Sequence, residues 1–404
     1  MLQDIVVLGG GPAGLSTALH LAQIAPELSS RILILEKAHY PRHKLCGGAL
    51  TADAEVILQG LGLDVAEIPH VDAAEAHFDF AGRGLVLAIA GPHTLRMIRR
   101  DEFDAWLASK ARRAGIEIRE GVTARSLQPG GDAVLVDTDA GQFDARVVVG
   151  ADGSNGMTRR AILPQEPIHT ARALEVLIPA HGAERGANGA GVPRMERDAH
   201  AADVAYFDFA PVPSGIAGYT WDFPTQVNGQ PMRCWGVYDT NLLADMPRPP
   251  LRQPLADAMR QQGSSLDDVE LQGHPIRWFS PRAPLSRPRI LLVGDAAGAD
   301  GIFGEGIGIA LGYGLVAAQT IRNAFERQDF SFRDYRRRLL LSPLGRALTA
   351  RTVITHVLYR LRWAWFQKLF WRVFKPVVRP VSMVVVLNWA RRMRPGKIAP
   401  GMKL

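Results

Sequence analysis

Residues 4–22, DIVVLGGGPAGLSTALHLA, place an apolar strand, a glycine-rich turn and a helix in direct succession. In the turn, Gly9 permits a tight bend, Gly11 lets a pyrophosphate approach the backbone, and Gly14 lets the helix lie close to the strand. The first amides of the helix then point at the phosphates with the positive end of the helix dipole. This order of strand, turn and helix predicts a dinucleotide-binding unit.

A carboxylate follows at the distance that such a unit requires. The second apolar segment, residues 31–36 (RILILE), ends in Glu36, about 20 residues after the glycine turn, where an acid accepts hydrogen bonds from ribose hydroxyls. Pro12 and Ala13 inside the turn, and Lys37 after the acid, belong to the same expected site. A purely structural glycine turn is the alternative, but it does not account for the strand, the helix and the acid together.

Three later segments also lead from regular structure into a glycine or an aspartate. Residues 99–121 read as an amphipathic helix followed by a short strand, and residues 145–160 contain an apolar strand that ends at Asp152. Residues 289–321 read as a strand, a glycine-dense turn and a long helix of small residues. Segments so far apart in the chain predict one sheet assembled from separated parts, whose loops converge on one extended ligand.

The overall composition is that of an ordinary globular protein, with 404 residues of which 47% are hydrophobic and 22% are charged. Two cysteines cannot form a disulfide framework, and no Cys/His cluster has zinc-ligand spacing, so no metal is expected. The first residues run directly into a strand, without a signal-peptide pattern. We therefore expect a reducing compartment and a cytoplasmic protein.

Charge is divided unevenly along the chain. From Arg333 onward there are 17 Lys and Arg and a single acid, Asp334, whereas the first 332 residues hold 30 basic and 39 acidic residues. An acidic body with a strongly basic tail predicts an anionic partner, which is a membrane surface, an acidic protein or nucleic acid. Nucleic acid is the weakest of these alternatives, because the body is acidic and no binding motif is visible.

The basic tail is also rich in aromatic residues. It holds half of the protein's 8 tryptophans: Trp363, Trp365, Trp371 and Trp389. Its longest apolar run, residues 381–387, falls far short of the ~20 residues that span a bilayer. Basic residues interleaved with Trp, Phe and Leu predict helices that lie in a membrane interface, and a helical cap packed on the acidic body is the alternative. Pro376 and Pro380 predict two or three helices rather than one.

Four parts of the chain together resemble the para-hydroxybenzoate hydroxylase-like family of FAD-dependent enzymes. They are residues 9–14 with Glu36, Arg100-x-x-Phe103-Asp104, Gly150-Ala151-Asp152-Gly153 with Arg159, and Gly294-Asp295. The resemblance implies bound FAD, with Asp295 at its ribityl and pyrophosphate groups and Arg100 against its nucleotide. The expected cofactor site then also includes Asp152, Gly294, Gly304, Gly306 and Ile307. A simple helix N-cap is the alternative role for Asp295.

Two further motifs resemble those of the geranylgeranyl reductases within that family. One is Pro41-x-x-Lys44-x-Cys46-Gly47-Gly48, and the other is Tyr219-x-Trp221-x-Phe223-Pro224. Tyr219 and Trp221 alternate with polar residues, as on a strand with one face lining a cavity. The resemblance implies that this cavity holds a prenyl chain, which aromatic side chains contact over a large area. The alternative is an aromatic stripe that packs the sheet against a neighbour.

The candidate catalytic residues are Cys46, Tyr219 and Trp221, and the expected cofactor contacts also include Lys44, Cys46, Gly47 and Gly48. A thiol is mostly protonated at pH 7 and can supply the proton that reduction of a carbon–carbon double bond requires. A nearby Lys44 would instead lower the pKa of the thiol and favour a thiolate. Packing under the flavin as a small apolar side chain is the third alternative for Cys46. Gly47 and Gly48 would let the backbone approach the isoalloxazine ring.

The predicted fold class is α/β (α+β), with a split Rossmann-like FAD-binding domain, an inserted antiparallel-sheet substrate domain and C-terminal helices. The predicted boundaries are residues 1–70, 96–160 and 281–330 for the FAD-binding domain, 71–95 and 161–280 for the substrate domain, and 331–404 for the basic helical region. The chain has no second GxGxxG turn, so NADPH or NADH, if used, would bind transiently as an electron donor.

The resemblance implies an FAD-dependent oxidoreductase that reduces carbon–carbon double bonds of an isoprenoid or similar apolar substrate, with reduced FAD as hydride donor. The alternative enzyme is an FAD-dependent monooxygenase that acts on an aromatic or carrier-bound substrate through a flavin C4a-hydroperoxide. A non-catalytic flavoprotein or electron-transfer partner is a third class, which the aromatic motif disfavours. The expected partners are an apolar or lipid substrate and, through the basic tail, an anionic membrane surface on the inner face of the membrane.

Overall fold

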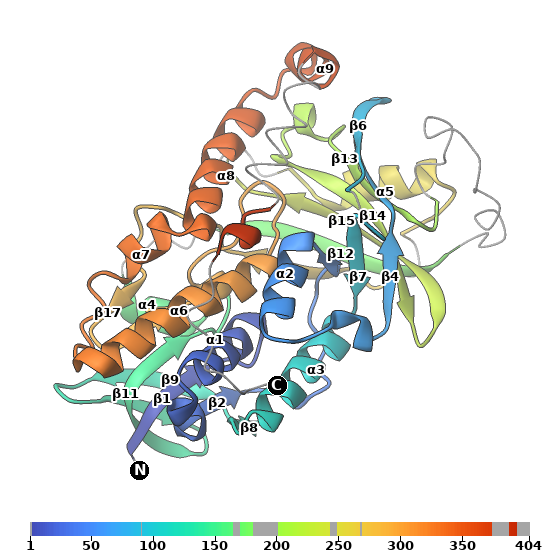
Figure 1. Ribbon diagram of the computed structural model, residues 1–404. Helices are drawn as coiled ribbons and strands as arrows, with labels where there is room; N and C mark the ends of the chain where they lie inside the picture. Colours follow the sequence, from blue (N-terminus) through green and yellow to red (C-terminus); the bar gives the residue numbers. More distant parts are fainter. Residues whose placement is uncertain are drawn as a thin grey trace.

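The structure of the protein is a computed structural model that describes residues 2–89, 91–164, 170–180, 201–242, 249–266, 269–373 and 388–393. Two large sheets lie at opposite ends of the molecule, and the C-terminal helices run along one side from the first sheet towards the second (Figure 1). The mixed α/β class predicted from the sequence is confirmed.

The first sheet is built around parallel strands from separated parts of the chain. Its order within the described residues is β17-β18-β11-β1-β2-β8, and β10 and β9 extend it antiparallel from β11. Its strands are β1 (Leu2–Leu8), β2 (Ile32–Glu36), β8 (Glu117–Glu120), β9 (Ala124–Pro129), β10 (Val134–Thr138), β11 (Gly141–Gly150), β17 (Ser286–Arg287) and β18 (Ile290–Leu292). β2 is buried along its whole length, which explains why residues 32–35 are all apolar and only Glu36 at its end is charged.

Helices α1 (Pro12–Ile24) and α6 (Ile307–Arg327) lie side by side against this sheet, with α2 (Ala52–Gly60) and α3 (Arg100–Arg113) beside them. Glycines set the spacing of this layer. A Cβ on Gly14 would lie 2.1 Å from the Gly9 carbonyl oxygen, and one on Gly314 would lie 2.3 Å from Ser16 Oγ. No side chain fits at such distances, so Gly14 stands where close packing of helix on strand requires it.

The second sheet is almost entirely antiparallel. Its order in the described part of the chain is β16-β12-β15-β14-β13-β5-β6, and only β5 and β13 run parallel. Its strands are β5 (Glu75–Phe80), β6 (Arg83–Leu87), β12 (Ala171–Pro179), β13 (Val204–Asp208), β14 (Gly218–Val227), β15 (Gln230–Asp239) and β16 (Gln272–Ile276). Helix α5 (Arg252–Gln261) covers one face, where Leu255 and Met259 pack against Trp235 and Val237. The opposite face is left for a ligand.

Shorter elements connect the two large sheets. A small sheet has the order β3-β7-β4, formed by β3 (Ala49–Leu50), β7 (Leu95–Ile98) and β4 (His70–Ala73). The remaining short elements are α4 (Met157–Ile162) and the 3-10 helices η1 (Pro26–Arg31), η2 (Val65–Glu67), η4 (Val212–Ser214), η5 (Gly294–Ala296) and η7 (Ala390–Arg392). Residues 71–95 thus contribute β5 and β6 to the sheet otherwise made by residues 161–280, and the domain boundaries themselves stay a prediction.

The C-terminal region folds into α7 (Tyr335–Leu341), α8 (Pro343–Arg360) and α9 (Ala364–Val373). The described helices are separated at Ser342 and at residues 361–363. Pro376, Pro380 and the apolar run 381–387 lie outside the described residues. No helix in the described ranges is both long and apolar enough to cross a bilayer.

The four tail tryptophans divide into two pairs. Trp371 and Trp389 are buried, with exposed fractions of 4% and 1%, whereas Trp363 and Trp365 are exposed to 55% and 64%. Trp389 packs on α6, where a Cβ on Gly312 would lie 2.6 Å from its ring. The packed-cap interpretation therefore describes one pair, and the exposed pair needs a separate explanation.

Candidate active site

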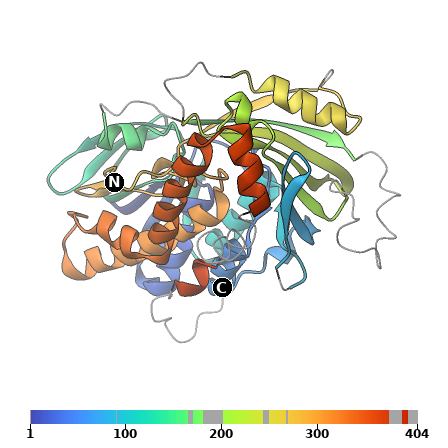
Figure 2. The ribbon, with the colours of Figure 1, turned by 90° about the horizontal axis from the view of Figure 1, so that it is seen from above.

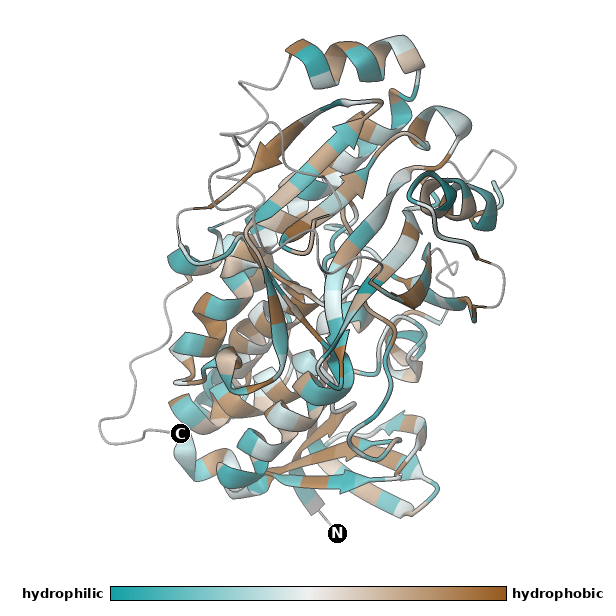
Figure 3. Ribbon diagram, turned by 90° about the vertical axis from the view of Figure 1, so that its right-hand side faces the viewer, coloured by the Kyte–Doolittle hydropathy of each residue, from teal (hydrophilic) through white to brown (hydrophobic). Residues whose placement is uncertain are grey.

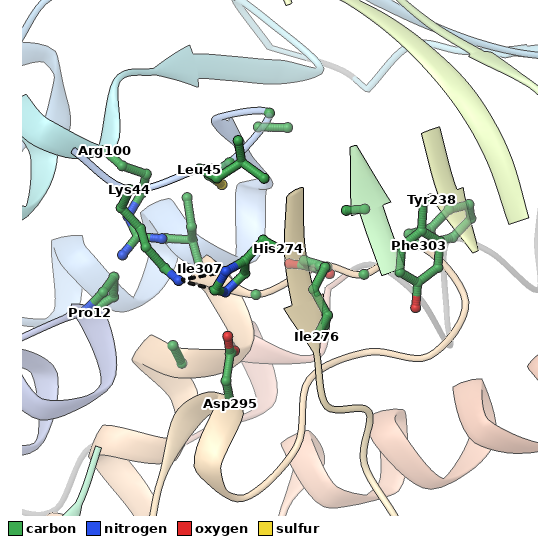
Figure 4. A pocket seen from close by; sticks show the side chains of 18 of the residues that line it. Pro12, Lys44, Leu45, Arg100, Tyr238, His274, Ile276, Asp295, Phe303 and Ile307 are labelled. Carbon is green, nitrogen blue, oxygen red and sulfur yellow. Dashed lines mark hydrogen bonds between the residues drawn. The ribbon is translucent and has the colours of Figure 1, made fainter. Parts of the chain in front are cut away.

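A cavity of about 990 Å³ extends from the glycine turn before α1 to the second sheet and to helices α8 and α9. Its first end is formed by loops at the carboxyl ends of β1, β2 and β11, where a split dinucleotide fold binds its ligand. Its middle contains the Lys44–Cys46 segment, Arg100, His274 and Asp295 (Figure 4). Its far end is aromatic and aliphatic.

Two helix N-termini open into this cavity without a capping side chain. The N-cap residues are Gly11 for α1 and Gly306 for α6, and both line the cavity. Their first backbone amides are therefore open to anionic or carbonyl groups of a ligand. Gly9 has a φ of +111°, and a Cβ there would lie 2.3 Å from the Ala151 carbonyl oxygen, so the turn requires glycine.

Asp295 lies beside the N-terminus of α6. Its Oδ1 is 3.7 Å from the position that a Cβ on Gly306 would take, and its carboxylate points into the cavity (Figure 4). Val293 and Gly306 are the N-caps of η5 and α6, so the alternative role of Asp295 as a helix N-cap is wrong. Arg159 donates to the Ala296 carbonyl oxygen at 2.9 Å and holds the turn in place. Asp295 thus lies on a turn that the hydrogen bond from Arg159 stabilises.

Glu36 joins the glycine turn to the end of β2. Its Oε2 accepts from the Gly10 amide at 2.8 Å, and its Oε1 accepts from the Ala38 amide at 3.1 Å. Arg42 Nε lies 3.4 Å from Glu36 Oε2, and Arg42 Nη2 lies 3.1 Å from Asp104 Oδ2. A carboxylate has about four lone-pair sites, so Glu36 keeps acceptor capacity for a ribose. The sequence analysis missed Arg42, although it lies between Pro41 and Lys44 of a motif already in view.

Lys44, Arg100 and His274 form a cationic group in the middle of the cavity. Arg100 donates to both oxygens of the buried Asp104, at 2.9 and 2.8 Å. Lys44 Nζ lies 2.6 Å from His274 Nε2, as Figure 4 shows. Burial and the charge of Lys44 lower the pKa of His274 to about 4, so the imidazole is neutral at pH 7 and accepts from the ammonium group. The group therefore presents positive charge to a ligand next to Asp295.

Cys46 carries a protonated thiol. Burial raises its pKa, and the positive charge of Arg100 opposes this only in part. This contradicts the thiolate alternative. The glycines that follow have packing reasons of their own: a Cβ on Gly48 would lie 2.1 Å from the Ile98 carbonyl oxygen, and one on Gly47 would lie 3.1 Å from the Phe223 ring. Close packing therefore requires a small residue at both positions, and approach of the flavin to their backbone stays a prediction.

Glu175 is a buried carboxyl group that the sequence analysis missed. It lies on β12, lines the cavity and is 6% exposed. The Cys46 backbone amide and the Cys234 thiol donate hydrogen bonds to it, but burial dominates and raises its pKa to about 7. A carboxyl group that still holds a proton near neutral pH can act as an acid. In the sequence, the signal that could have identified Glu175 is its position as the lone acid in the apolar segment ALEVLI, residues 173–178.

Strand β14 presents Tyr219, Trp221 and Phe223 to the cavity. Phe207 packs among these rings, with ring centroids 5.4 Å from Tyr219 and 4.9 Å from Phe223. The Tyr219 hydroxyl donates to the Phe303 carbonyl oxygen at 2.6 Å, so its proton is already in use. A Cβ on Gly236 would lie 2.1 Å from the Trp221 ring, so this glycine makes room for the indole. Tyr219 and Trp221 are thus wall residues of the cavity.

Most of the predicted site residues line this cavity. They are Gly9, Gly11, Pro12, Ala13, Glu36, Lys37, Lys44, Cys46, Gly47, Gly48, Arg100, Asp152, Tyr219, Trp221, Asp295, Gly304, Gly306 and Ile307. Gly14 and Gly294 are not among the lining residues, and a Cβ on Gly294 would be 2.6 Å from Ala13 Cβ, so their contact with the cofactor stays a prediction. Asp152 also has a second role, because it accepts from the Thr158 amide and hydroxyl at 2.8 and 2.9 Å and so caps α4.

Comparisons with known proteins agree with this geometry. The family model described as FAD binding domain matches residues 3–194. A digeranylgeranylglycerophospholipid reductase of Thermoplasma volcanium is 27% identical over 354 residues, covering 81% of this chain and 80% of the relative. A solved geranylgeranyl bacteriochlorophyll reductase-like protein from Thermoplasma acidophilum superposes with a TM-score of 0.72 at 20% identity, covering 95% of this chain and all of that one. In sequence and in fold, the chain is similar to geranylgeranyl reductase-like FAD-dependent oxidoreductases.

Other members of the fold carry different chemistry. The halogenase PltM in complex with phloroglucinol and FAD superposes with a TM-score of 0.63 at 16% identity, covering 88% of this chain and 76% of that one. Likeness at this identity shows the fold alone. The fold therefore does not by itself separate a reductase from an oxygen-using enzyme.

The protein binds FAD, and the residues of the cavity fit this cofactor. The uncapped N-terminus of α1 would hold the pyrophosphate, and Glu36 would hold the adenosine ribose. Asp295 would accept from ribityl hydroxyls, and the amides at the start of α6, with Lys44 and Arg100, would face the electron-rich parts of the ring system. When bound and reduced, FAD supplies a hydride.

Replacing Asp295 with alanine is expected to weaken FAD binding about ten- to a hundredfold, because a charged acceptor beside the cofactor is lost. The dissociation constant, measured by flavin fluorescence titration of the apoprotein, checks this expectation. Asp257→Ala, on the outer helix α5, is the control and should bind FAD as the wild type does. Wild-type affinity in Asp295→Ala would show that this carboxylate has no part in holding FAD.

Proposed function

We propose that this enzyme reduces carbon–carbon double bonds in an isoprenoid chain, such as that of a polyprenyl lipid. The observation that carries the proposal is the continuity of the cavity. It begins at the FAD-binding turn, passes Cys46 and Glu175, and ends in a chamber to which the described residues contribute no charged side chain. A flexible hydrocarbon chain that extends from the flavin into the protein matches such a chamber.

The far chamber is formed by apolar residues of three layers. Its walls include Phe78 and Leu85 from the β5–β6 hairpin, Ile354 from α8, and Phe366 and Phe370 from α9. A small aromatic substrate with hydroxyl or carboxylate groups would leave those groups without partners there, at a cost of roughly 1–3 kcal/mol each. The polar groups that the cavity does offer lie near the flavin end, where the reaction takes place.

Reduction of the double bond needs a hydride on one carbon and a proton on the other. The described residues place two protonated groups near the flavin end, Cys46 Sγ and the Glu175 carboxyl. The Cys46 backbone amide donates to Glu175, so the two groups lie next to each other. Glu175 is the stronger acid near neutral pH and is the proposed proton donor, directly or through the thiol. Bound reduced FAD would supply the hydride for one new C–H bond, Glu175 would supply the proton for the other, and solvent would then return a proton to this acid.

Turnover without oxygen is the decisive test of this function. The enzyme should be reduced anaerobically with dithionite, NADPH or NADH, and then mixed with geranylgeranyl diphosphate or with extracted prenyl lipids. The expected result is reoxidation of the flavin together with a product heavier by two hydrogen atoms per reduced double bond. Stopped-flow absorbance follows the flavin, and mass spectrometry identifies the product.

A monooxygenase gives the opposite pattern. Its reduced flavin stays reduced in the presence of the substrate until air is admitted, and its product gains an oxygen atom. That outcome would overturn the reductase proposal and favour the oxygen-using alternative.

A further inference from the structure

Exposed apolar side chains are concentrated in one part of the described structure. Every large hydrophobic residue that is strongly exposed there lies in α7, α8, α9 or the turn before α9: Leu341, Val353, Val357, Trp363, Trp365, Leu369 and Val373. Exposed apolar patches of this kind mark surfaces that meet another apolar phase. Six of these seven residues lie in the second half of α8, in the turn before α9 or on α9 itself.

Helix α9 carries large apolar side chains on both of its faces. Phe366, Phe370 and Trp371 turn inward and line the cavity, and Phe209 packs on Trp371 with ring centroids 5.0 Å apart. The outer face carries Trp365 and Leu369 together with the exposed Lys368. Figure 3 shows hydrophobic and hydrophilic residues alternating along this helix at the top of the molecule. A free helix in water would keep its outer face polar.

The cavity opens through the same patch. Val353 and Val357, one turn apart on α8, line the cavity and are nevertheless 59% and 54% exposed. Their side chains therefore stand at a mouth between α8 and α9. Figure 2 shows α9 beside the β5–β6 hairpin, whose residues Leu85 and Leu87 line the same chamber. The apolar interior and the apolar outer surface are continuous at this point.

The charge around the mouth is positive. Arg360, Lys368 and Arg372 are exposed there, and no acidic residue follows Asp334 anywhere in the sequence. Tryptophans and basic residues interleaved on one surface are the composition of segments that lie at the headgroup level of an anionic bilayer. Each Lys or Arg near such a surface adds to the attraction.

We propose that the outer face of α8 and α9 lies in an anionic lipid bilayer and that the substrate enters the cavity from the acyl-chain region through the mouth at Val353 and Val357. A prenyl chain then passes from lipid to protein without crossing water. The exposure and charge of α8 and α9 support the membrane-binding surface, and only the identity of the substrate that enters through the mouth rests on the proposed function.

Flotation with vesicles tests the surface independently of any activity. The holoenzyme should float with vesicles of equal parts phosphatidylcholine and phosphatidylglycerol at about 0.1 M salt, and much less at about 1 M, where the Debye length falls from about 10 Å to about 3 Å. Replacing Trp363 and Trp365 together with serine should reduce binding about tenfold or more, because these rings supply the buried apolar area. Both residues are exposed, so the fold should tolerate the change.

Two control variants make the result specific. Leu341→Ser removes an equally exposed apolar residue that α8 separates from the mouth by about 20 Å. Arg260→Gln removes an exposed charge on α5, at the far side of the second sheet. Both controls should bind vesicles as the wild type does.

Quenching by brominated acyl chains locates the contact. Part of the tryptophan fluorescence should be quenched on vesicles that carry brominated lipids, and this part should disappear in the double serine variant. Absence of binding at low salt, or wild-type binding and quenching by the double variant, would overturn the proposal. A stable dimer in light scattering, with no vesicle binding, would assign the patch to contact between two copies of the chain. Vesicle binding with no alkene reduction would leave the surface standing and overturn the proposed function alone.

Discussion

Replacing Glu175 with glutamine is expected to slow turnover about a hundredfold or more while FAD stays bound. The amide keeps the size of the carboxyl group and its place on β12, but it cannot give up a proton to the substrate or to Cys46. Rates of flavin reoxidation by an alkene in single-turnover experiments measure the loss. The flavin absorbance of the purified variant shows that the site is still loaded.

The pH dependence distinguishes an acid from a merely structural residue. The pKa of Glu175 is raised from 4.5 to about 7, so the carboxyl is protonated below about pH 7 and loses its proton above it. Wild-type reoxidation should therefore slow as the pH rises through about 7, and this inflection should vanish in Glu175→Gln. The free energy of unfolding changes in the same direction. Between about pH 4.5 and 7, Glu175 is ionised in the unfolded chain but still protonated in the folded protein, so the stability of the fold falls as the pH rises. The glutamine variant should escape this fall and be the more stable protein at pH 8.

Two further variants test whether the rate loss is specific to Glu175 and whether Cys46 takes part in proton transfer. Glu75→Gln replaces another buried carboxyl group of the same sheet, which pairs with His77 at 2.9 Å and does not line the cavity, and it should leave reoxidation unchanged. Cys46→Ala tests whether the proton passes through the thiol. A rate loss as large as that of Glu175→Gln places Cys46 in the path, and a small loss makes it a packing residue. Full activity in Glu175→Gln at every pH would remove Glu175 from the reaction.

Replacing Arg351 with methionine is expected to destabilise the fold by about 3–5 kcal/mol. Arg351 is fully buried on α8, with Nη1 2.6 Å from Glu305 Oε2 and 3.4 Å from Asp300 Oδ2. The two acids belong to the turn between η5 and α6, and Thr51 donates to Glu305 Oε1 at 3.0 Å. Without the arginine, the fully buried Asp300 and the largely buried Glu305 lose their cation. Urea denaturation monitored by tryptophan fluorescence measures the change.

Neutralising the acids should reverse most of this loss. A triple variant with Arg351→Met, Asp300→Asn and Glu305→Gln removes the arginine together with both acids that pair with it, and it should recover most of the stability. The deficit of the single variant should also shrink as the pH falls, because burial already raises the pKa of Asp300 and removal of the arginine raises it further. Arg346→Met, an exposed arginine on the same helix, is the control. A loss of less than about 1 kcal/mol in Arg351→Met would show that this cluster does not anchor α8.

The sequence alone determined the nucleotide end of the site. The turn at Gly9, Gly11 and Gly14 and the acid Glu36 are local patterns, because backbone geometry restricts which residues can occupy a tight turn between a strand and a helix. The aromatic alternation at Tyr219 and Trp221 was readable for the same reason, since a strand turns every second side chain to one face. The stated resemblance added FAD and the place of Asp295.

The tertiary structure alone decided the chemistry of the middle of the cavity. Glu175 is unremarkable within its strand, and only its burial in the assembled fold raises its pKa to about 7, against the opposing hydrogen bonds from the Cys46 amide and the Cys234 thiol. The sequence left open whether Lys44 lies close to the thiol, and in the structure its ammonium group contacts His274, which is far away in the sequence. Such pKa shifts depend on desolvation and on neighbours from other elements, and no local pattern encodes them.

In the C-terminal tail, too, the sequence determined one part of the result and the tertiary structure the other. Its composition predicted that aromatic and basic residues act together, yet the sequence left a membrane interface and a packed cap as equal alternatives. The folded structure determines which tryptophans are buried. Trp389 fits the space left by Gly312, and Trp371 packs on Phe209. Trp363 lies just before α9 and Trp365 faces outward from it, and both are exposed. Burial depends on which surfaces meet across the fold, so a sequence determines that a helix is amphipathic but only the assembled structure determines what each face contacts.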